Sequence, residues 1–232
     1  MAADAQVAIF FYGGRWKCGA KADYRFVGQA LTSKGIIAVI ADYRLYPDVR
    51  FPAFVEDGAR AIGWVRRNIT RRGGDPDRIY LIGHSAGAHI AAMLSLDSRF
   101  LAAENVLAAD LGGLIGLAGP YDFLPIEDSV VKEVFAMDNL RDTQPITHAG
   151  PQAPSMLLLT GTEEQTVLPR NSQRLGDLIN DVGGDAHVRI YERIGHIGII
   201  LALASPFRWL APTLEDIVAF IERTSRSKRK AA

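Results

Sequence analysis

Ser85 lies in the segment Gly83-His84-Ser85-Ala86-Gly87, whose Gly-x-Ser-x-Gly spacing is typical of a nucleophilic serine. The segment comes directly after an apolar run at 78–82 and directly before a helical pattern that begins at Ala86. Small residues around the serine permit a sharp turn from strand to helix, which exposes the hydroxyl above a sheet. A glycine-rich strand end is the structural alternative, but the strand and helix on either side favour a nucleophile.

A serine alcohol is a weak nucleophile until a base accepts its proton, and histidine is the usual base. The chain has five histidines. His196 follows the last apolar run on a loop flanked by Gly195 and Gly198, so we predict that it reaches Ser85 from the carboxyl edge of the sheet. The rivals for this role are His84, His89, His148 and His187.

The base in turn needs a carboxylate that holds its tautomer and stabilises the imidazolium. A turn at 161–167 follows the apolar run at 155–160 and contains Glu164, which we predict to be this acid. The chain order serine, acid, histidine is the order used by hydrolases of the strand–elbow–helix type. Glu163 and Asp122 are the alternative acids. The structural alternative is that the carboxylates of this turn are simply solvated and have no catalytic role.

An ester carbonyl under attack becomes an oxyanion, which backbone N–H groups must stabilise. We expect one donor from Ala86, directly after the nucleophile. The second should come from the segment Tyr12-Gly13-Gly14-Arg15-Trp16, where paired glycines let amides turn inward. Gly14 is the predicted donor, with Gly13 or Arg15 as alternatives. The same segment fails as a phosphate-binding loop, because Gly19 is followed by alanine rather than by Lys-Ser/Thr.

Short apolar runs alternate with longer amphipathic patterns along the chain. The apolar runs lie at 6–12, 36–41, 78–83, 113–119, 155–160 and 187–191, and the helical patterns lie at about 20–33, 54–72, 86–97, 170–182 and 214–223. Apolar runs without alternation are typical of strands covered on both faces of a parallel sheet. The pattern therefore predicts an α/β fold with a mostly parallel sheet of about six strands and right-handed crossovers.

The sequence shows no boundary, so we expect a single domain over residues 1–232. Residues 121–154 form a longer excursion with one helical pattern at 130–137, and long insertions of this kind often serve as lids or pocket walls. We expect Trp16, Tyr121, Phe123 and Ile197 to form walls of a substrate pocket, although each could equally belong to the core.

Composition excludes several classes of function. Twenty-six basic residues balance 26 acidic ones, so the chain has no net positive charge that would attract nucleic acid. The single cysteine, Cys18, excludes a disulfide framework or a cysteine-rich metal site. We find no ligand motif for a metal and expect no cofactor. The sequence also shows no secretory signal and no apolar run long enough to span a membrane, so we expect a cytoplasmic protein.

Taken together, the motifs resemble those of the α/β-hydrolases, in particular small serine esterases near the carboxylesterase, hormone-sensitive-lipase and kynurenine-formamidase-like groups. Residues 12–16 are similar to the His-Gly-Gly-x-Trp segment of that family, residues 42–53 to its Asp-Tyr-Arg-Leu-Ala-Pro-Glu…Phe-Pro-Ala stretch, and Gly161-x-x-Glu164-x-x-Val167 to its acid turn. The resemblance runs from about 7 to 221. It implies a three-layer α/β-hydrolase fold with a small cap or none.

Three features depart from the family pattern. Tyr12 replaces the usual histidine, and Glu164 replaces the commoner aspartate. Family members usually carry two or more strands before the first one seen here, so family topology leaves the run at 36–41 as an apolar edge strand. Exposed apolar edges pair with other chains, and we therefore predict a homodimer through this edge. The alternative is an N-terminus shorter than the natural one, which predicts low stability.

The resemblance and the motifs together predict a serine hydrolase that cleaves small carboxylic esters with Ser85, His196 and Glu164 through an acyl-enzyme. An arylformamidase or amidase with the same residues is the first alternative. A non-catalytic scaffold that binds a ligand or a partner through the inherited pocket is the second.

Overall fold

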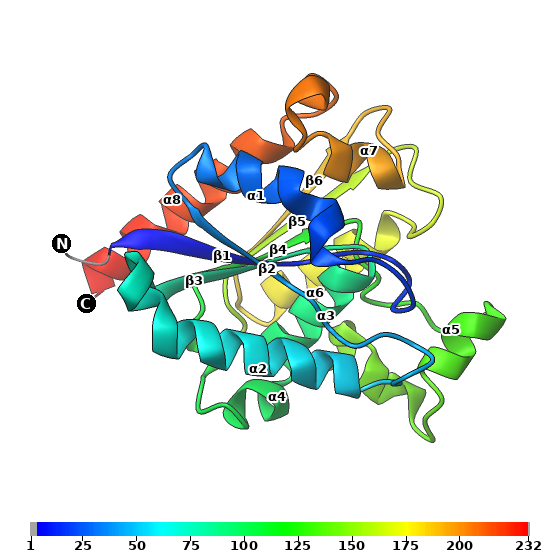
Figure 1. The fold of residues 1–232 in the computed structure, drawn as a ribbon. Helices are drawn as coiled ribbons and strands as arrows, with labels where there is room; N and C mark the ends of the chain where they lie inside the picture. The colour runs from blue at the N-terminus through cyan, green and yellow to red at the C-terminus, as the bar shows by residue number, and fades with distance from the viewer. Residues whose placement is uncertain (1–3, 232) are drawn as a thin grey trace.

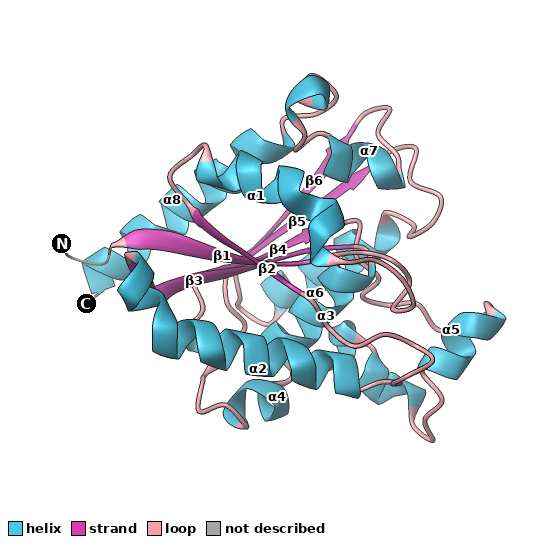
Figure 2. Cartoon of the chain, in the orientation of Figure 1, coloured by secondary structure: helices cyan, strands magenta, loops and turns pink. Residues whose placement is uncertain are grey.

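The computed structural model describes residues 4–231, and for 226–231 it describes the backbone alone. Its centre is one six-stranded sheet, and every pair of neighbouring strands is parallel. The strands are β1 (Ala5–Phe11), β2 (Ile37–Ala41), β3 (Gly74–His84), β4 (Gly113–Leu117), β5 (Met156–Gly161) and β6 (Ala186–Tyr191). Their order is β2-β1-β3-β4-β5-β6 (Figure 2). The predicted parallel sheet is confirmed.

Helices cover both faces of this sheet. The α-helices of the described chain are α1 (Arg25–Thr32), α2 (Ala53–Asn68), α3 (Ala86–Leu96), α4 (Ser98–Ala102), α5 (Ser129–Val134), α6 (Arg170–Asp181), α7 (His196–Leu201) and α8 (Thr213–Ala231). Helices α1 and α8 lie on one face, and α2, α3 and α6 lie on the other (Figure 1). The result is the expected arrangement of three layers.

The core is densest where α3 packs behind the central strands. Every residue of α3 from Ala86 to Ser95 is buried, so this helix is enclosed around its whole circumference. The neighbouring elements approach α3 closely, which explains the small residues at their contacts. At Gly58 of α2, an added Cβ would lie 2.8 Å from Leu94. Burial of a large apolar side chain stabilises a fold by about 1.5–3 kcal/mol, so this interior holds β3 and α3 rigidly where Ser85 joins them.

Three expectations about the limits of helices were wrong. His196 does not stand on a loop; it is the first residue of α7. The last helix begins near the predicted residue but extends to Ala231, beyond the expected end at 223. Within the excursion, the helical pattern at 130–137 is realised as the shorter α5, which ends at Val134.

Strand β2 lies at one edge of the sheet, as expected, and pairs only with β1. Its residues from Ile37 to Ile40 are half-buried, whereas β1 is buried from Val7 to Phe11. Within the residues that the structure describes, no helix combines the length and the apolar character needed to cross a membrane.

Candidate active site

Ser85 occupies a strained turn between the end of β3 and the start of α3. Its backbone has φ 53° and ψ −121°, a region that residues with a side chain rarely adopt. Its N–H donates to the carbonyl of Leu117 at 2.9 Å, which ties the turn to the end of β4. Glycine is required two residues before Ser85 and two residues after it. An added Cβ at Gly83 would lie 2.3 Å from the carbonyl oxygen of Gly87, and an added Cβ at Gly87 would lie 2.1 Å from the carbonyl oxygen of Phe11.

The structure brings together the three side chains that the sequence singled out. The hydroxyl of Ser85 lies 2.9 Å from Nε2 of His196, and Nδ1 of His196 lies 2.7 Å from Oε2 of Glu164. Because the carboxylate accepts the proton on Nδ1, the Nε2 lone pair is free to accept the serine proton. All three residues are largely buried, with 7% of Ser85 and 4% of Glu164 exposed. Such a chain can activate an alcohol as a nucleophile.

Glu164 is held in its ionised form. Its second oxygen, Oε1, accepts hydrogen bonds from the N–H groups of Thr166 at 2.7 Å and Val167 at 2.9 Å. Burial alone raises the pKa of Glu164, but the hydrogen bond with His196 and those two amides outweigh burial and place the pKa below its ordinary value. The turn at 161–167 thus presents one oxygen to its own backbone and the other to the imidazole.

The rival carboxylates lie in other contacts. Asp122 forms an ion pair with Arg174 of α6 at 2.5 Å. Glu163 is exposed, and its N–H donates to the carbonyl of Ile194 at 3.0 Å. Only Glu164 of the three is hydrogen-bonded to the imidazole of His196 among the described contacts.

The four rival histidines also make hydrogen bonds or ion pairs elsewhere. His89 is fully buried, and its Nε2 donates to the carbonyl of Thr143 at 2.8 Å. His148 donates to the carbonyl of Asp142, and His187 lies exposed on β6 beside Asp185. The fourth, His84, donates from Nε2 to the main-chain carbonyl of His196 at 2.9 Å.

The loop after β1 packs against the serine. A Cβ at Gly13 would lie 2.9 Å from Nδ1 of His84 and 3.1 Å from the Cβ of Ser85, so a side chain there would force these neighbours to shift. The carbonyl of Gly13 accepts from the hydroxyl of Tyr24 at 3.4 Å, and that of Gly14 accepts from the N–H of Cys18 at 3.1 Å. In a planar trans peptide the following N–H points the opposite way. The amides of Gly14 and Arg15 therefore point away from these internal contacts.

Tyr12 fixes this loop in place of the histidine usual in the family. Its ring stacks between Tyr24 and Tyr43, with centroid distances of 5.5 and 4.7 Å. Its hydroxyl donates to Oδ1 of Asp42 at 3.2 Å, and the Tyr43 hydroxyl donates to the Tyr12 carbonyl at 2.7 Å. Burial and the charge of Asp42 raise the pKa of Tyr12 to about 12, so the phenol stays protonated and keeps its donor role. Asp42 is the first residue of the segment 42–53, which also resembles a motif of the α/β-hydrolases.

A cavity of about 550 Å³ opens beside Ser85. Trp16 and Phe123 line it, but Tyr121 and Ile197 do not. Tyr121 is fully buried against Gly116, where an added Cβ would lie 1.8 Å from its hydroxyl. Ile197 is 57% exposed on α7. The expectation that these two residues form pocket walls is therefore corrected: one belongs to the core and the other to the surface.

Most of the remaining cavity wall was missed by sequence reasoning. The other lining residues are Arg15, Pro120, Asp122, Leu124, Pro125, Ile126, Glu127, Asp128, Val131, Gln165, Thr166, Val167, Leu168, Arg170 and Asn171. Arg15 comes from the loop after β1, and the other residues come from Pro120 and the excursion, from the acid turn and from the start of the helix that follows it. Asn171 fixes the start of the excursion, because its Oδ1 accepts from the N–H groups of Tyr121 and Asp122, both at 2.9 Å. No sequence pattern marks an asparagine in the first turn of a helix for this role.

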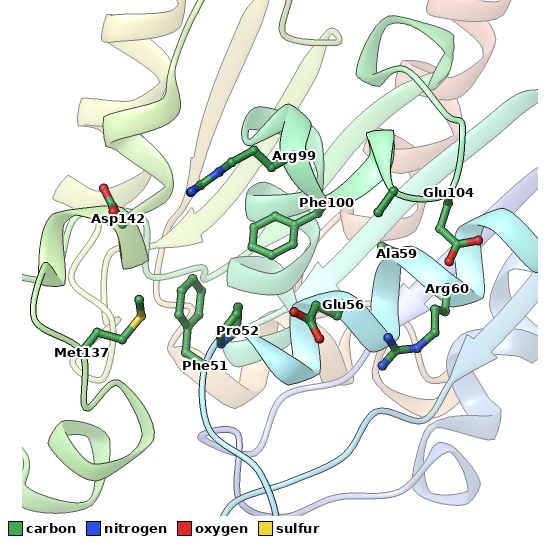
Figure 3. A pocket seen from close by; sticks show the side chains of 11 residues that line it. Phe51, Pro52, Glu56, Ala59, Arg60, Arg99, Phe100, Glu104, Met137 and Asp142 are labelled. Atoms are coloured by element: carbon green, nitrogen blue, oxygen red, sulfur yellow. The ribbon is translucent and has the colours of Figure 1, made fainter.

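A second cavity, of about 340 Å³, shares no lining residue with the first. Figure 3 shows it between α2, α4 and the excursion, lined by Phe51, Pro52, Glu56, Ala59, Arg60, Arg99, Phe100, Ala103, Glu104, Met137 and Asp142. It contains no serine, cysteine or histidine. Among the described side chains, no group of three or more His, Cys, Asp or Glu residues could hold a metal ion. The cavity beside Ser85 is therefore the candidate site.

Comparison with known proteins finds relatives of similar sequence along nearly the whole chain. Over 239 residues the chain is 29% identical to the probable isoprenylcysteine alpha-carbonyl methylesterase ICMEL1 of Arabidopsis thaliana, a match that covers 93% of this chain and 50% of that protein. Over 245 residues it is 27% identical to esterase LipQ of Mycobacterium tuberculosis, covering 98% of this chain and 58% of that protein. The chain thus spans about half the length of these curated relatives.

Solved structures are similar in fold. The apo form of Thermogutta terrifontis esterase 2 superposes with a TM-score of 0.82 at 24% identity, covering 95% of this chain and 84% of that one. A family model described as BD-FAE matches residues 1–179, well over half of the chain. The protein therefore has the α/β-hydrolase fold and belongs to the BD-FAE family.

Proposed function

We propose that this protein is a serine hydrolase that cleaves small carboxylic esters. The single observation that carries the proposal is the hydrogen-bonded chain from Glu164 through His196 to Ser85, at the edge of a 550 Å³ cavity. Relatives named as esterases and as a methylesterase support an ester as the substrate class.

In the proposed mechanism, the Ser85 oxygen attacks the ester carbonyl while Nε2 of His196 accepts the hydroxyl proton. Glu164 stabilises the imidazolium that forms. His196 then gives the proton to the departing alcohol, which leaves an acyl group on Ser85. A water molecule, deprotonated by the same imidazole, attacks this acyl-enzyme; the imidazolium returns that proton to the departing Ser85 oxygen, which releases the acid and restores the free enzyme. Each step needs His196 to alternate between neutral and protonated forms.

The oxyanion of each tetrahedral intermediate is assigned to backbone donors. Ala86 is the first residue of α3, so its N–H has no acceptor within the helix. The amide of Gly14 is the proposed second donor, with Arg15 and Gly13 beside it. Removing one donor of this kind typically costs about 3–4 kcal/mol of transition-state stabilisation. Two donors on opposite sides of Ser85 would clamp one oxygen.

The shape of the cavity favours compact substrates. Trp16, Phe123, Leu124 and Val131 supply apolar wall, and the excursion that carries three of them is too short to form a separate cap domain. Apolar pockets of this size bind a small acyl or aryl group and leave polar groups to fix its orientation. We propose short acyl chains rather than long lipids on this basis.

The test combines turnover with labelling. Wild-type protein should hydrolyse a p-nitrophenyl ester panel with highest kcat/KM for short chains, and an organophosphonate should label Ser85 stoichiometrically. Ser85→Ala should abolish both while leaving the melting temperature unchanged. An N-formyl aryl amide turned over faster than an aryl acetate would identify an amidase. A folded protein that takes up no label would refute catalysis and support the scaffold alternative.

A further inference from the structure

His84 stands between the two loops that flank the nucleophile. Its Nε2 donates to the main-chain carbonyl of His196 at 2.9 Å, and the two imidazole rings are 4.9 Å apart. On its other side, Nδ1 faces the loop after β1, where a Cβ at Gly13 would lie 2.9 Å from it. The side chain is buried, with 3% of the residue exposed.

His196 lies at the N-terminal end of a very short helix. It begins α7, a helix of only six residues, whose preceding residue Gly195 provides no side-chain cap. A helix this short is not stable in isolation, so contacts from outside it must fix its first residue. The bond from His84 fixes the carbonyl of His196 itself, and thereby the point from which the imidazole extends.

We propose that His84 is a positioning residue that holds the main chain of His196, so that Nε2 of His196 stays in line with the Ser85 hydroxyl. The proposal rests on the proposed ester hydrolysis and extends it to the variable position of the Gly-x-Ser-x-Gly segment. His84 touches no reacting atom and acts through His196.

The hydrogen bond also fixes the tautomer of His84. Because Nε2 must carry the proton, Nδ1 carries none, and this buried nitrogen has no hydrogen-bond partner among the described atoms. Burial and the neighbouring charge of His196 lower the pKa of His84 to about 4, against the opposing influence of Glu164. His84 therefore remains a neutral single donor wherever His196 works as a base.

His89 provides a matched control. It too is fully buried, donates from Nε2 to a main-chain carbonyl, at 2.8 Å, and has an Nδ1 without a described partner. Its acceptor is Thr143, in the excursion, so it makes the same type of bond without contacting His196. If only the loss of a buried histidine mattered, variants at both positions should lose the same amount of activity. If His84 positions His196, the loss of kcat should appear in the His84 variants alone.

The experiment compares His84→Gln, which places an amide donor near the position of Nε2, with His84→Asn, which is too short to reach the acceptor. With p-nitrophenyl acetate, His84→Asn should lower kcat by about 10- to 100-fold with little change in KM, the scale expected when a reacting group shifts by about 1 Å. His84→Gln should restore most of this loss. His89→Asn should lower the melting temperature as His84→Asn does, but not kcat to that extent.

Folded His84→Asn protein with wild-type kcat would overturn the proposal, as would His84→Gln that is as slow as His84→Asn. Should His84→Asn not fold, His84→Met, which has no donor, replaces it in the same comparison. The low-field NMR signal of the Nδ1 proton between His196 and Glu164 provides a readout that needs no turnover. It should broaden in His84→Asn and sharpen again in His84→Gln, and an unchanged signal in both would overturn the proposal even if wild-type protein hydrolysed no ester.

Discussion

At the scale of single residues, the site depends on where each polar atom finds its partner. Glu164 divides its two oxygens between backbone amides and the imidazole of His196, so it has no freedom to rotate. The extra methylene of a glutamate, compared with the aspartate common in the family, is accommodated by this turn. A carboxylate with two backbone donors keeps its charge, and a charged partner is what an imidazolium needs.

The first prediction concerns this acid. Glu164→Gln should lower kcat by roughly 10²- to 10⁴-fold, because the amide favours the wrong histidine tautomer and cannot stabilise an imidazolium. Steady-state kinetics with p-nitrophenyl acetate would measure the loss. Glu163→Gln, the exposed neighbour, is the control and should keep wild-type kcat. An active Glu164→Gln together with an inactive Asp122→Asn would show that the acid is Asp122.

At the scale of elements, the cavity is bounded by segments that are far apart in sequence and joined by side-chain contacts. Arg15, in the loop after β1, forms an ion pair with Asp128, which directly precedes α5 in the excursion. Both residues line the cavity beside Ser85. Asp128 also caps α5, because its Oδ1 accepts from the N–H groups of Val130 at 2.9 Å and Val131 at 3.0 Å. This contact connects the loop after β1 with the cavity wall that the excursion forms.

The second prediction separates the ion pair from the cap. Asp128→Asn keeps a good helix N-cap and removes the charge, so it should raise KM for small esters by about 2- to 5-fold with little change in kcat, on the scale of an exposed ion pair. Salt of about 1 M should raise the wild-type KM in the same way. Glu133→Gln, which breaks the pair of α5 with Arg50 outside the cavity, is the control. An equal rise in KM in the control would contradict the prediction.

At the scale of the whole molecule, two buried histidines link stability to pH. Burial lowers the pKa of both His84 and His89 to about 4, from an ordinary value of 6.5. The charges that face them are His196 and Glu164 around His84, and His148 beside His89. Between pH 6.5 and 4 the unfolded chain binds protons that the folded chain does not, so the unfolding free energy must fall as the pH falls.

The third prediction follows from that sign. Above about pH 7 neither histidine adds to the pH dependence of the unfolding free energy, which should decrease between pH 6.5 and 4 by roughly 3 kcal/mol for each histidine. Carboxylates with lowered pKa, such as Glu164, add a further loss only below about pH 4.5. Urea denaturation at several pH values would measure the slope. His89→Gln should reduce it by about half, and an identical slope in that variant would contradict the assignment.

The fourth prediction concerns assembly. Strand β2 is an edge strand with half-buried apolar residues, and such an edge pairs with another chain unless it is covered or charged. We predict a homodimer through residues 36–41, with a mass in light scattering of twice the 25.3 kDa chain. A mass of one chain at every working concentration would contradict it.

The sequence alone determined the strands, the elbow and the identity of the three side chains that converge. Each of these depends on local signals: apolar runs bounded by glycines, a serine between small residues, and polar residues placed directly after strands. Because the carboxyl ends of parallel strands meet at one edge, Ser85, Glu164 and His196 had to come near one another once the sheet was parallel.

Only the tertiary structure decided which neighbouring side chains surround them. Tyr121 and Ile197 look alike as apolar residues near motifs, yet one is packed against Gly116 and the other faces solvent. The bond from His84 to His196 and the pair of Arg15 with Asp128 join residues more than 100 positions apart. Such contacts depend on how loops pack on a finished sheet, and no short-range pattern records that packing.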